Sequence, residues 1–96
     1  MGIDELLGGH RKAVLDLAVK HGARHVRIFG SVARGSAGPT SDIDVLVSMD
    51  RGRSLLDLCA LGDDLEDLLG RKVDILTEAA ISPCLRDRIL SEAIAL

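Results

Sequence analysis

Two carboxylates, Asp42 and Asp44, stand two residues apart at the start of an apolar segment and are the residues best suited to chemistry. Hydrophobic residues alternate along 42–48, which predicts a strand with both carboxylates on one face, about 6–7 Å apart at Cα. Two such charges repel by roughly 2–3 kcal/mol at an effective dielectric near 20. A divalent cation would relieve that repulsion, and Mg²⁺ prefers one or two carboxylates completed by water and phosphate oxygens.

A third carboxylate, Asp74, stands alone in the apolar segment RKVDILTE at 71–78, where a further strand is predicted over 71–76. If this strand lies beside 42–48, three acids converge and can hold one or two Mg²⁺ ions that flank a phosphoryl or nucleotidyl displacement. An isolated Asp in a strand is more often an edge residue than a ligand, so the prediction depends on the combination.

The pair Gly30-Ser31 follows a short apolar segment and suits the binding of an anion. Glycine lets the backbone approach phosphate closely, amide groups at a turn or helix start cradle it, and the Ser31 hydroxyl adds a donor. Arg34 is either a further phosphate contact or a surface residue that orders the loop. A phosphate cradle beside metal-binding acids indicates a nucleoside triphosphate.

The spacing of these residues is more specific than any one of them. Gly-Ser, ten residues and then Asp-x-Asp should arise by chance in a chain this short only about once in a thousand. The stretch FGSVARGSAGPTSDIDVLV at 29–47 resembles the signature of the DNA polymerase β-like nucleotidyltransferase superfamily. Nearly the whole chain is similar to the minimal nucleotidyltransferase antitoxins, which pair with HEPN-domain toxins.

This resemblance assigns a role to each residue of the site. It implies that Gly30 and Ser31 bind the triphosphate. It implies that Asp42 and Asp44 hold the cations, while Asp74, also a metal ligand, helps to activate the acceptor hydroxyl. It further implies an enzyme that transfers AMP from ATP to a tyrosine hydroxyl of a cognate HEPN RNase toxin and thereby neutralises it.

The alternative is an antitoxin that neutralises its toxin by binding alone and keeps a vestigial nucleotide site. The leucines of the segment 55–69 motivate it, because they form a stripe wider than one core face needs. A small fold that buries most of this helix explains the stripe equally well. A small-molecule acceptor is less favoured, because the antibiotic-modifying relatives carry an extra domain. The preferred nucleotide, the number of AMP units and the stoichiometry of a complex remain open.

Composition narrows the possible partners and the compartment. The 96 residues carry a net charge of −3 and a single aromatic residue, Phe29, which argues against direct binding to nucleic acid. No segment approaches the ~20 apolar residues of a membrane span, and we expect a cytoplasmic protein. We expect Cys59 and Cys84 to be reduced and packed as small apolar side chains.

The elements that position these residues form a single predicted domain over 1–96. Ser54 and Gly70 bound the middle helix as cap and stop, and the connection 32–41 has room for one helical turn at most. None of the three histidines is expected to be catalytic. The predicted order is helix 3–22, strand 26–29, strand 42–48, helix 55–69, strand 71–76 and helix 83–95. This order predicts an α/β (α+β) fold, a small mixed sheet covered by helices.

Overall fold

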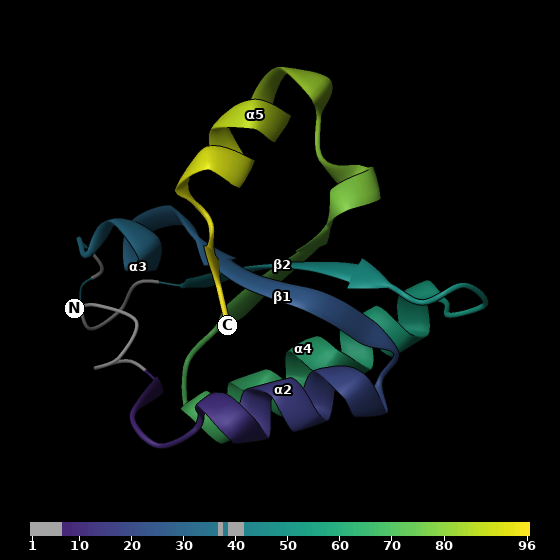
Figure 1. Ribbon diagram of the computed structural model, residues 1–96. Coiled ribbons are helices and arrows are strands. Elements are labelled where there is room, and N and C mark those ends of the chain that lie inside the picture. The colour runs from purple at the N-terminus through teal and green to yellow at the C-terminus, as the bar shows by residue number, and fades with distance from the viewer. Residues whose placement is uncertain (1–6, 37, 39–41) are drawn as a thin grey trace.

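A four-stranded sheet forms the centre of the protein, as the computed structural model of residues 7–36, 38 and 42–96 shows (Figure 1). The strands lie in the order β3-β2-β1-β4. Their bounds are Ala23–Phe29 for β1, Ile43–Met49 for β2, Val73–Thr77 for β3 and Ile94–Ala95 for β4. β1 runs antiparallel to β2 and β4, whereas β2 and β3 are parallel. The predicted small mixed sheet is therefore confirmed.

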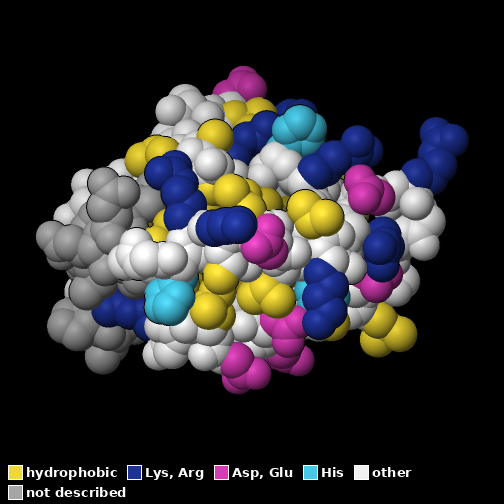
Figure 2. Space-filling view, turned by 60° about the horizontal axis from the view of Figure 1, so that its bottom comes forward, with side chains coloured by type: hydrophobic (Ala, Val, Ile, Leu, Met, Phe, Trp, Pro, Cys, Tyr) yellow, Lys and Arg dark blue, Asp and Glu magenta, His cyan; other side chains and the backbone are white. Residues whose placement is uncertain are grey.

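Two helices, α2 (Arg11–Lys20) and α4 (Leu55–Leu69), lie side by side below the sheet in Figure 1. His21, directly after α2, places Nε2 2.6 Å from Oδ2 of Asp64 on α4, and this contact joins the two helices. Figure 2 turns the α2 and α4 side forward and shows charged side chains of both signs around scattered hydrophobic ones. His21 therefore has a structural partner, in keeping with the expectation that it is not catalytic.

An aliphatic core fills the layer between the sheet and these two helices. Every second residue of β2 is buried in it, namely Ile43, Val45 and Val47. The same buried cluster includes Leu61 and Leu65 of α4. Because side chains alternate along a strand, the residues of β2 between these three must point to the opposite face of the sheet.

Among the described residues, the opposite face carries α3 (Gly30–Arg34), the 3₁₀ turn η1 (Glu78–Ala80) and α5 (Pro83–Glu92). Figure 1 shows α5 standing above the sheet. Leu46 of β2 is buried on this face, whereas α5 has no buried residue at all. Asp44, two residues before Leu46, shares its face, so the acids lie on the less covered side of the sheet.

The middle helix has the predicted bounds, because local signals set both of its ends. At the start, the Ser54 amide donates to Asp57 Oδ2 at 2.9 Å and closes a capping box. At the end, Gly70 takes a left-handed conformation with φ 67°, and its amide donates to the Glu66 carbonyl at 2.8 Å.

The leucine stripe of α4 is divided between core and surface. Leu61 and Leu65 are buried, whereas Leu55 and Leu56 in the first turn are 73% and 80% exposed. Burial by the fold itself thus accounts for the middle of the stripe. The first turn is an uncovered apolar surface.

The first predicted helix, 3–22, is interrupted near its start, although Leu7 is helical. Gly8 has a positive φ of 54° within a turn, and α2 begins only at Arg11. The first four residues of the predicted span lie outside the described part of the chain. The following strand is longer than predicted and begins at Ala23 rather than at 26.

The last predicted helix, 83–95, is too long at its end. α5 stops at Glu92, and the next residues pair with β1 as a fourth strand that the sequence did not predict, with Ala95 opposite Arg27. The Leu96 amide adds a hydrogen bond of 3.0 Å to the Val26 carbonyl. Pairing with a distant strand therefore overrides the local preference for helix.

Both cysteines differ in part from the expectation. Cys59 and Cys84 form no disulfide, as predicted, but both are exposed rather than packed in the core. Among the described residues, no helix is long and apolar enough to cross a membrane.

Candidate active site

The parallel pairing of β2 and β3 places two of the three predicted acids opposite each other. Asp44 and Asp74 are register partners, so they lie side by side on one face of the sheet. Both point away from α2 and α4, because Ile43 and Val73, which precede them, belong to the core. Asp42 stands just before β2 and is half-buried. The prediction that the two strands are neighbours is confirmed.

The acids act on one another electrostatically. Burial raises the pKa of the Asp44 carboxyl above its ordinary value of 3.8, and repulsion from Asp74 and then from Asp42 raises it further. The Arg34 guanidinium lowers this pKa, and the Glu92 carboxylate raises it again. One arginine thus stands among four carboxylates, and the net field at Asp44 favours a bound cation.

Gly30 follows β1 and begins α3 directly beside Asp44. Its φ of +73° is in the left-handed region, and a Cβ built on it would overlap the Asp44 Oδ2 atom. The register of β1 and β2, which sets Phe29 opposite Asp44, causes this close approach. The backbone at Gly30 therefore meets the acids with no side chain between them.

Ser31 and the loop after it form a short, internally bonded turn. The Ser36 amide donates to the Ser31 carbonyl at 2.9 Å, and Gly35 ends α3 with φ 75°. The helical turn within the predicted connection 32–41 thus begins earlier, at Gly30. Residues 37 and 39–41 of that connection lie outside the described part of the chain.

Arg34 lies at the end of α3 and forms an ion pair across the fold. Its Nη1 atom donates to both carboxylate oxygens of Glu92, each at 3.2 Å. Glu92 was not among the predicted site residues. No motif marks it, and the packing of α5 beside α3 together with the pairing of β4 with β1 brings it to Arg34.

The donor set suits a hard divalent cation that brings some of its own ligands. Within residues 7–36, 38 and 42–96, no three His, Cys, Asp or Glu side chains are close enough together to enclose a metal ion. Mg²⁺ needs only one or two carboxylates when water and substrate phosphates complete its octahedron. Asp44, with Asp74 opposite it and Asp42 nearby, fits that requirement.

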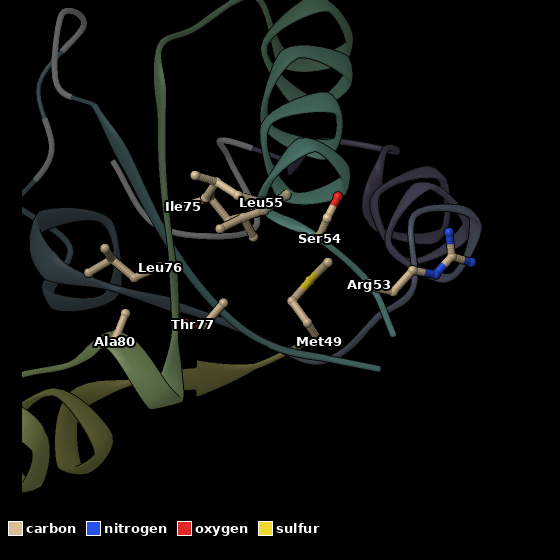
Figure 3. Close-up of a pocket in the computed structure, with 9 residues that line it drawn as sticks. Met49, Arg53, Ser54, Leu55, Ile75, Leu76, Thr77 and Ala80 are labelled. Atoms are coloured by element: carbon tan, nitrogen blue, oxygen red, sulfur yellow. The ribbon is translucent and has the colours of Figure 1, made fainter. Parts of the chain in front are cut away.

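A separate cavity of about 440 Å³ opens beside β3 (Figure 3). Its lining includes Met49 and Thr77, the last residues of β2 and β3, whereas the acids lie near the start of these strands. The lining of this cavity is largely apolar. Its apolar side chains include Leu55 and Leu58 of α4, Ile75 and Leu76 of β3, and Met49 at the end of β2. None of the three acids lines it.

Comparison with known proteins identifies the family. The profile described as a nucleotidyltransferase domain matches residues 9–96. The chain belongs to this family. A solved structure of a candidate minimal nucleotidyltransferase is 52% identical, with a TM-score of 0.87 over 96% of this chain and 94% of that one. The nucleotidyltransferase therefore has the expected polymerase β-like fold of the minimal group.

Two archaeal relatives cover nearly the whole nucleotidyltransferase. MJ0435 of Methanocaldococcus jannaschii, named as a candidate protein adenylyltransferase, is 46% identical over 98% of this chain and 97% of its own length. The protein adenylyltransferase MntA of Thermococcus cleftensis is 34% identical over 96% of this chain and 90% of its own length. A toxin–antitoxin structure with AMP-PNP shares the fold at 20% identity, with a TM-score of 0.75 over 88% of this chain and 69% of that one.

Proposed function

We propose that this nucleotidyltransferase is a Mg²⁺-dependent antitoxin that transfers AMP from ATP to a tyrosine hydroxyl of a cognate HEPN-domain RNase toxin. One observation carries the proposal: the Asp44 carboxylate, with Asp74 opposite, lies against the bare backbone of Gly30. An anion-binding turn and cation-binding acids meet at that point, as a nucleotide with its metal requires. The two archaeal relatives named as protein adenylyltransferases support a protein acceptor.

The phosphate end of ATP belongs beside the start of α3. Gly30 admits the triphosphate close to the backbone, and Ser31 adds its hydroxyl as a donor. Arg34, half exposed, supplies positive charge on the same side. A neighbour of the same fold was crystallised with AMP-PNP, which supports an adenine nucleotide.

The three acids have two different roles in the proposed reaction. Asp42 and Asp44 would hold one or two Mg²⁺ ions, which would supply positive charge at the phosphates of the nucleotide. Asp74 takes the proton of the acceptor hydroxyl. The acceptor oxygen bonds to the α-phosphorus, the bond from that phosphorus to the bridging oxygen breaks, and pyrophosphate leaves. Asp74 is exposed on the edge strand β3, where a tyrosine of another protein can reach it.

Transfer to the toxin is the direct test. The chain, Mg²⁺, ATP labelled at its α-phosphate and the HEPN protein encoded beside it are incubated together, and the labelled residue is located by mass spectrometry. We expect AMP on a tyrosine and loss of RNase activity. Asp42→Asn with Asp44→Asn should abolish both, whereas Asp50→Asn, an exposed change outside the site, should not. A toxin that is inhibited but unlabelled would refute catalysis.

Neutralisation by binding alone is the second candidate function. The exposed residues Leu55 and Leu56 favour it, because Leu55 lines the apolar cavity beside β3 and Leu56 follows it in the first turn of α4. A partner that covers this surface could be blocked without any transfer of AMP. Full neutralisation by the Asp42→Asn, Asp44→Asn double variant would support this candidate, and loss of neutralisation would exclude it.

A further inference from the structure

The C-terminal part of the chain brings a fourth carboxylate to the acid site. α5 stands above the sheet (Figure 1) and has no buried residue, yet its last residue, Glu92, contacts Arg34. β4 follows two residues later and pairs with β1, and Leu96 donates to the Val26 carbonyl. This short strand anchors the end of α5 and thereby fixes the position of Glu92.

Glu92 adds a negative charge at a place that already carries others. It occupies the C-terminal end of α5, where the helix dipole is negative. It also lies near enough to Asp44 to disfavour ionisation of that carboxyl. Arg34 offsets both effects through the paired contacts at 3.2 Å. A half-exposed ion pair contributes little to folding, so stability alone does not account for this carboxylate.

We propose that Glu92 is a positioning residue that holds the Arg34 guanidinium over the nucleotide site, an inference that rests on the proposed function. Glu92 is 23% exposed and Arg34 is 51% exposed, so the more buried carboxylate fixes the more mobile arginine. Both contacts use Nη1. The guanidinium carries five donors in a planar fork, and those outside the pair are free to face a phosphate.

The sign of the effect on nucleotide affinity tests this role. Removal of a negative charge beside a triphosphate site should by itself tighten binding. Loss of a positioned arginine should weaken it, because Arg34 must then be ordered when the nucleotide binds. We expect Glu92→Gln to raise the Kd for Mg²⁺ with AMP-PNP about 3- to 10-fold in isothermal titration calorimetry. Asp87→Asn, an exposed charge removal on the same helix, should leave the Kd unchanged.

The double variant separates positioning from a general structural effect. With Arg34→Ala in place, only the electrostatic effect of Glu92 remains, so Glu92→Gln should now lower the Kd or leave it unchanged. A Kd that is unchanged or lower in the single Glu92→Gln variant would overturn the positioning role while leaving the proposed function intact. A wild-type chain that binds no Mg²⁺ with AMP-PNP would overturn both. Thermal unfolding of each variant verifies that it is folded.

Discussion

At the scale of the residue, position 30 shows how the backbone itself forms part of the site. A side chain there would meet two obstacles, a φ of +73° and the Asp44 Oδ2 atom. The positive φ disfavours any residue with a Cβ wherever it occurs in a protein. The overlap with Asp44 Oδ2 would instead displace a carboxylate of the acid site. Gly35, at the other end of α3, has nearly the same φ of +75° but nothing within 4 Å of a built Cβ. The two glycines therefore form a matched pair.

Gly30→Ala should destabilise the protein more than Gly35→Ala and should also abolish nucleotide binding. The strain of a left-handed alanine, about 1–2 kcal/mol, is common to both variants. The displacement of Asp44 belongs to Gly30→Ala alone. Urea unfolding measures the difference in free energy, and titration with Mg²⁺ and AMP-PNP measures binding. Equal losses of stability in the two variants would show that Asp44 can move aside at no cost.

Asp44→Asn should stabilise the nucleotide-free protein at pH 7 while it removes activity. The folded pKa of Asp44 lies above the ordinary value of 3.8, chiefly because of burial and then because of Asp74. A carboxyl whose pKa is higher in the folded than in the unfolded protein destabilises the fold when it ionises. The loss of stability begins as pH rises through the unfolded-state pKa and is complete above the folded-state pKa. At pH 7 the asparagine avoids this loss, for a gain on the order of 0.5 kcal/mol, or roughly 2–4 °C in Tm.

Thermal unfolding between pH 3 and pH 7 checks this expectation. The advantage of Asp44→Asn should shrink toward the acidic end, because Asp44 is then protonated in both states. Asp16→Asn, an exposed change on α2, is the control for charge removal in general. A lower Tm for Asp44→Asn than for the wild type at pH 7 would contradict the electrostatic account.

At the scale of the element, α4 protects the edge strand that carries Asp74. β3 is the last strand of the sheet on its side, so every second residue turns its amide outward. Glu66 of α4 covers the first of these, since its Oε2 atom accepts from the Val73 amide at 2.8 Å. The same residue accepts from Gly70 through its carbonyl. One glutamate thus links the end of α4 to the start of β3.

Glu66→Ala should cost about 1–2 kcal/mol, because it leaves the Val73 amide without its acceptor beside the core. Glu66→Gln keeps an oxygen acceptor in the same place and should lose less than half of that. Urea unfolding at neutral pH compares the two variants with the wild type. If glutamine and alanine destabilise the protein equally, the carboxylate stabilises by its charge alone and not through this hydrogen bond.

The elements also show which features the sequence could predict. The sequence predicts the observed bounds of α4 because Ser54 and Gly70 are local signals that act within one turn. The end of α5 was missed because β4 exists only through pairing with β1, more than sixty residues earlier in the chain. Local propensity in 83–95 favours helix, and a tertiary contact decides otherwise.

The candidate site divides in the same way. Gly30, Ser31, Asp42 and Asp44 lie within one continuous motif, so their spacing alone marked them. Whether Asp74 lies near the other acids depends on the order of the strands. The parallel pairing of β2 with β3 places it opposite Asp44. Glu92 carried no signal at all, because its place depends on β4. Residues that a motif holds together were predictable, whereas residues that only the topology brings in were not.

At the scale of the whole molecule, β3 connects the acid site to the uncovered apolar surface. Asp74 and Leu76 are two residues apart and share a face, about 6–7 Å from each other along the strand. Leu76 is 38% exposed and lines the apolar cavity (Figure 3). The exposed Leu55, in the first turn of α4, lines the same cavity. A protein bound over this surface would extend along β3 to Asp74. Docking and transfer can therefore involve one surface that wraps around the edge strand β3, from α4 on one side of the sheet to Asp74 on the other.

If the proposed HEPN partner docks on this surface, Leu56→Glu should weaken its binding by about tenfold or more, and transfer of AMP should fall with it, while the Kd for Mg²⁺ with AMP-PNP stays unchanged. Leu56 is 80% exposed in the first turn of α4, where an acidic side chain suits the helix dipole, so the fold should tolerate the change. Val19→Glu, on α2 and 74% exposed, is the matched control and should bind the toxin as the wild type does. Calorimetry with the purified toxin measures both. Equal affinity in the two variants would place the docking surface elsewhere and leave Asp74 to meet its acceptor from another side.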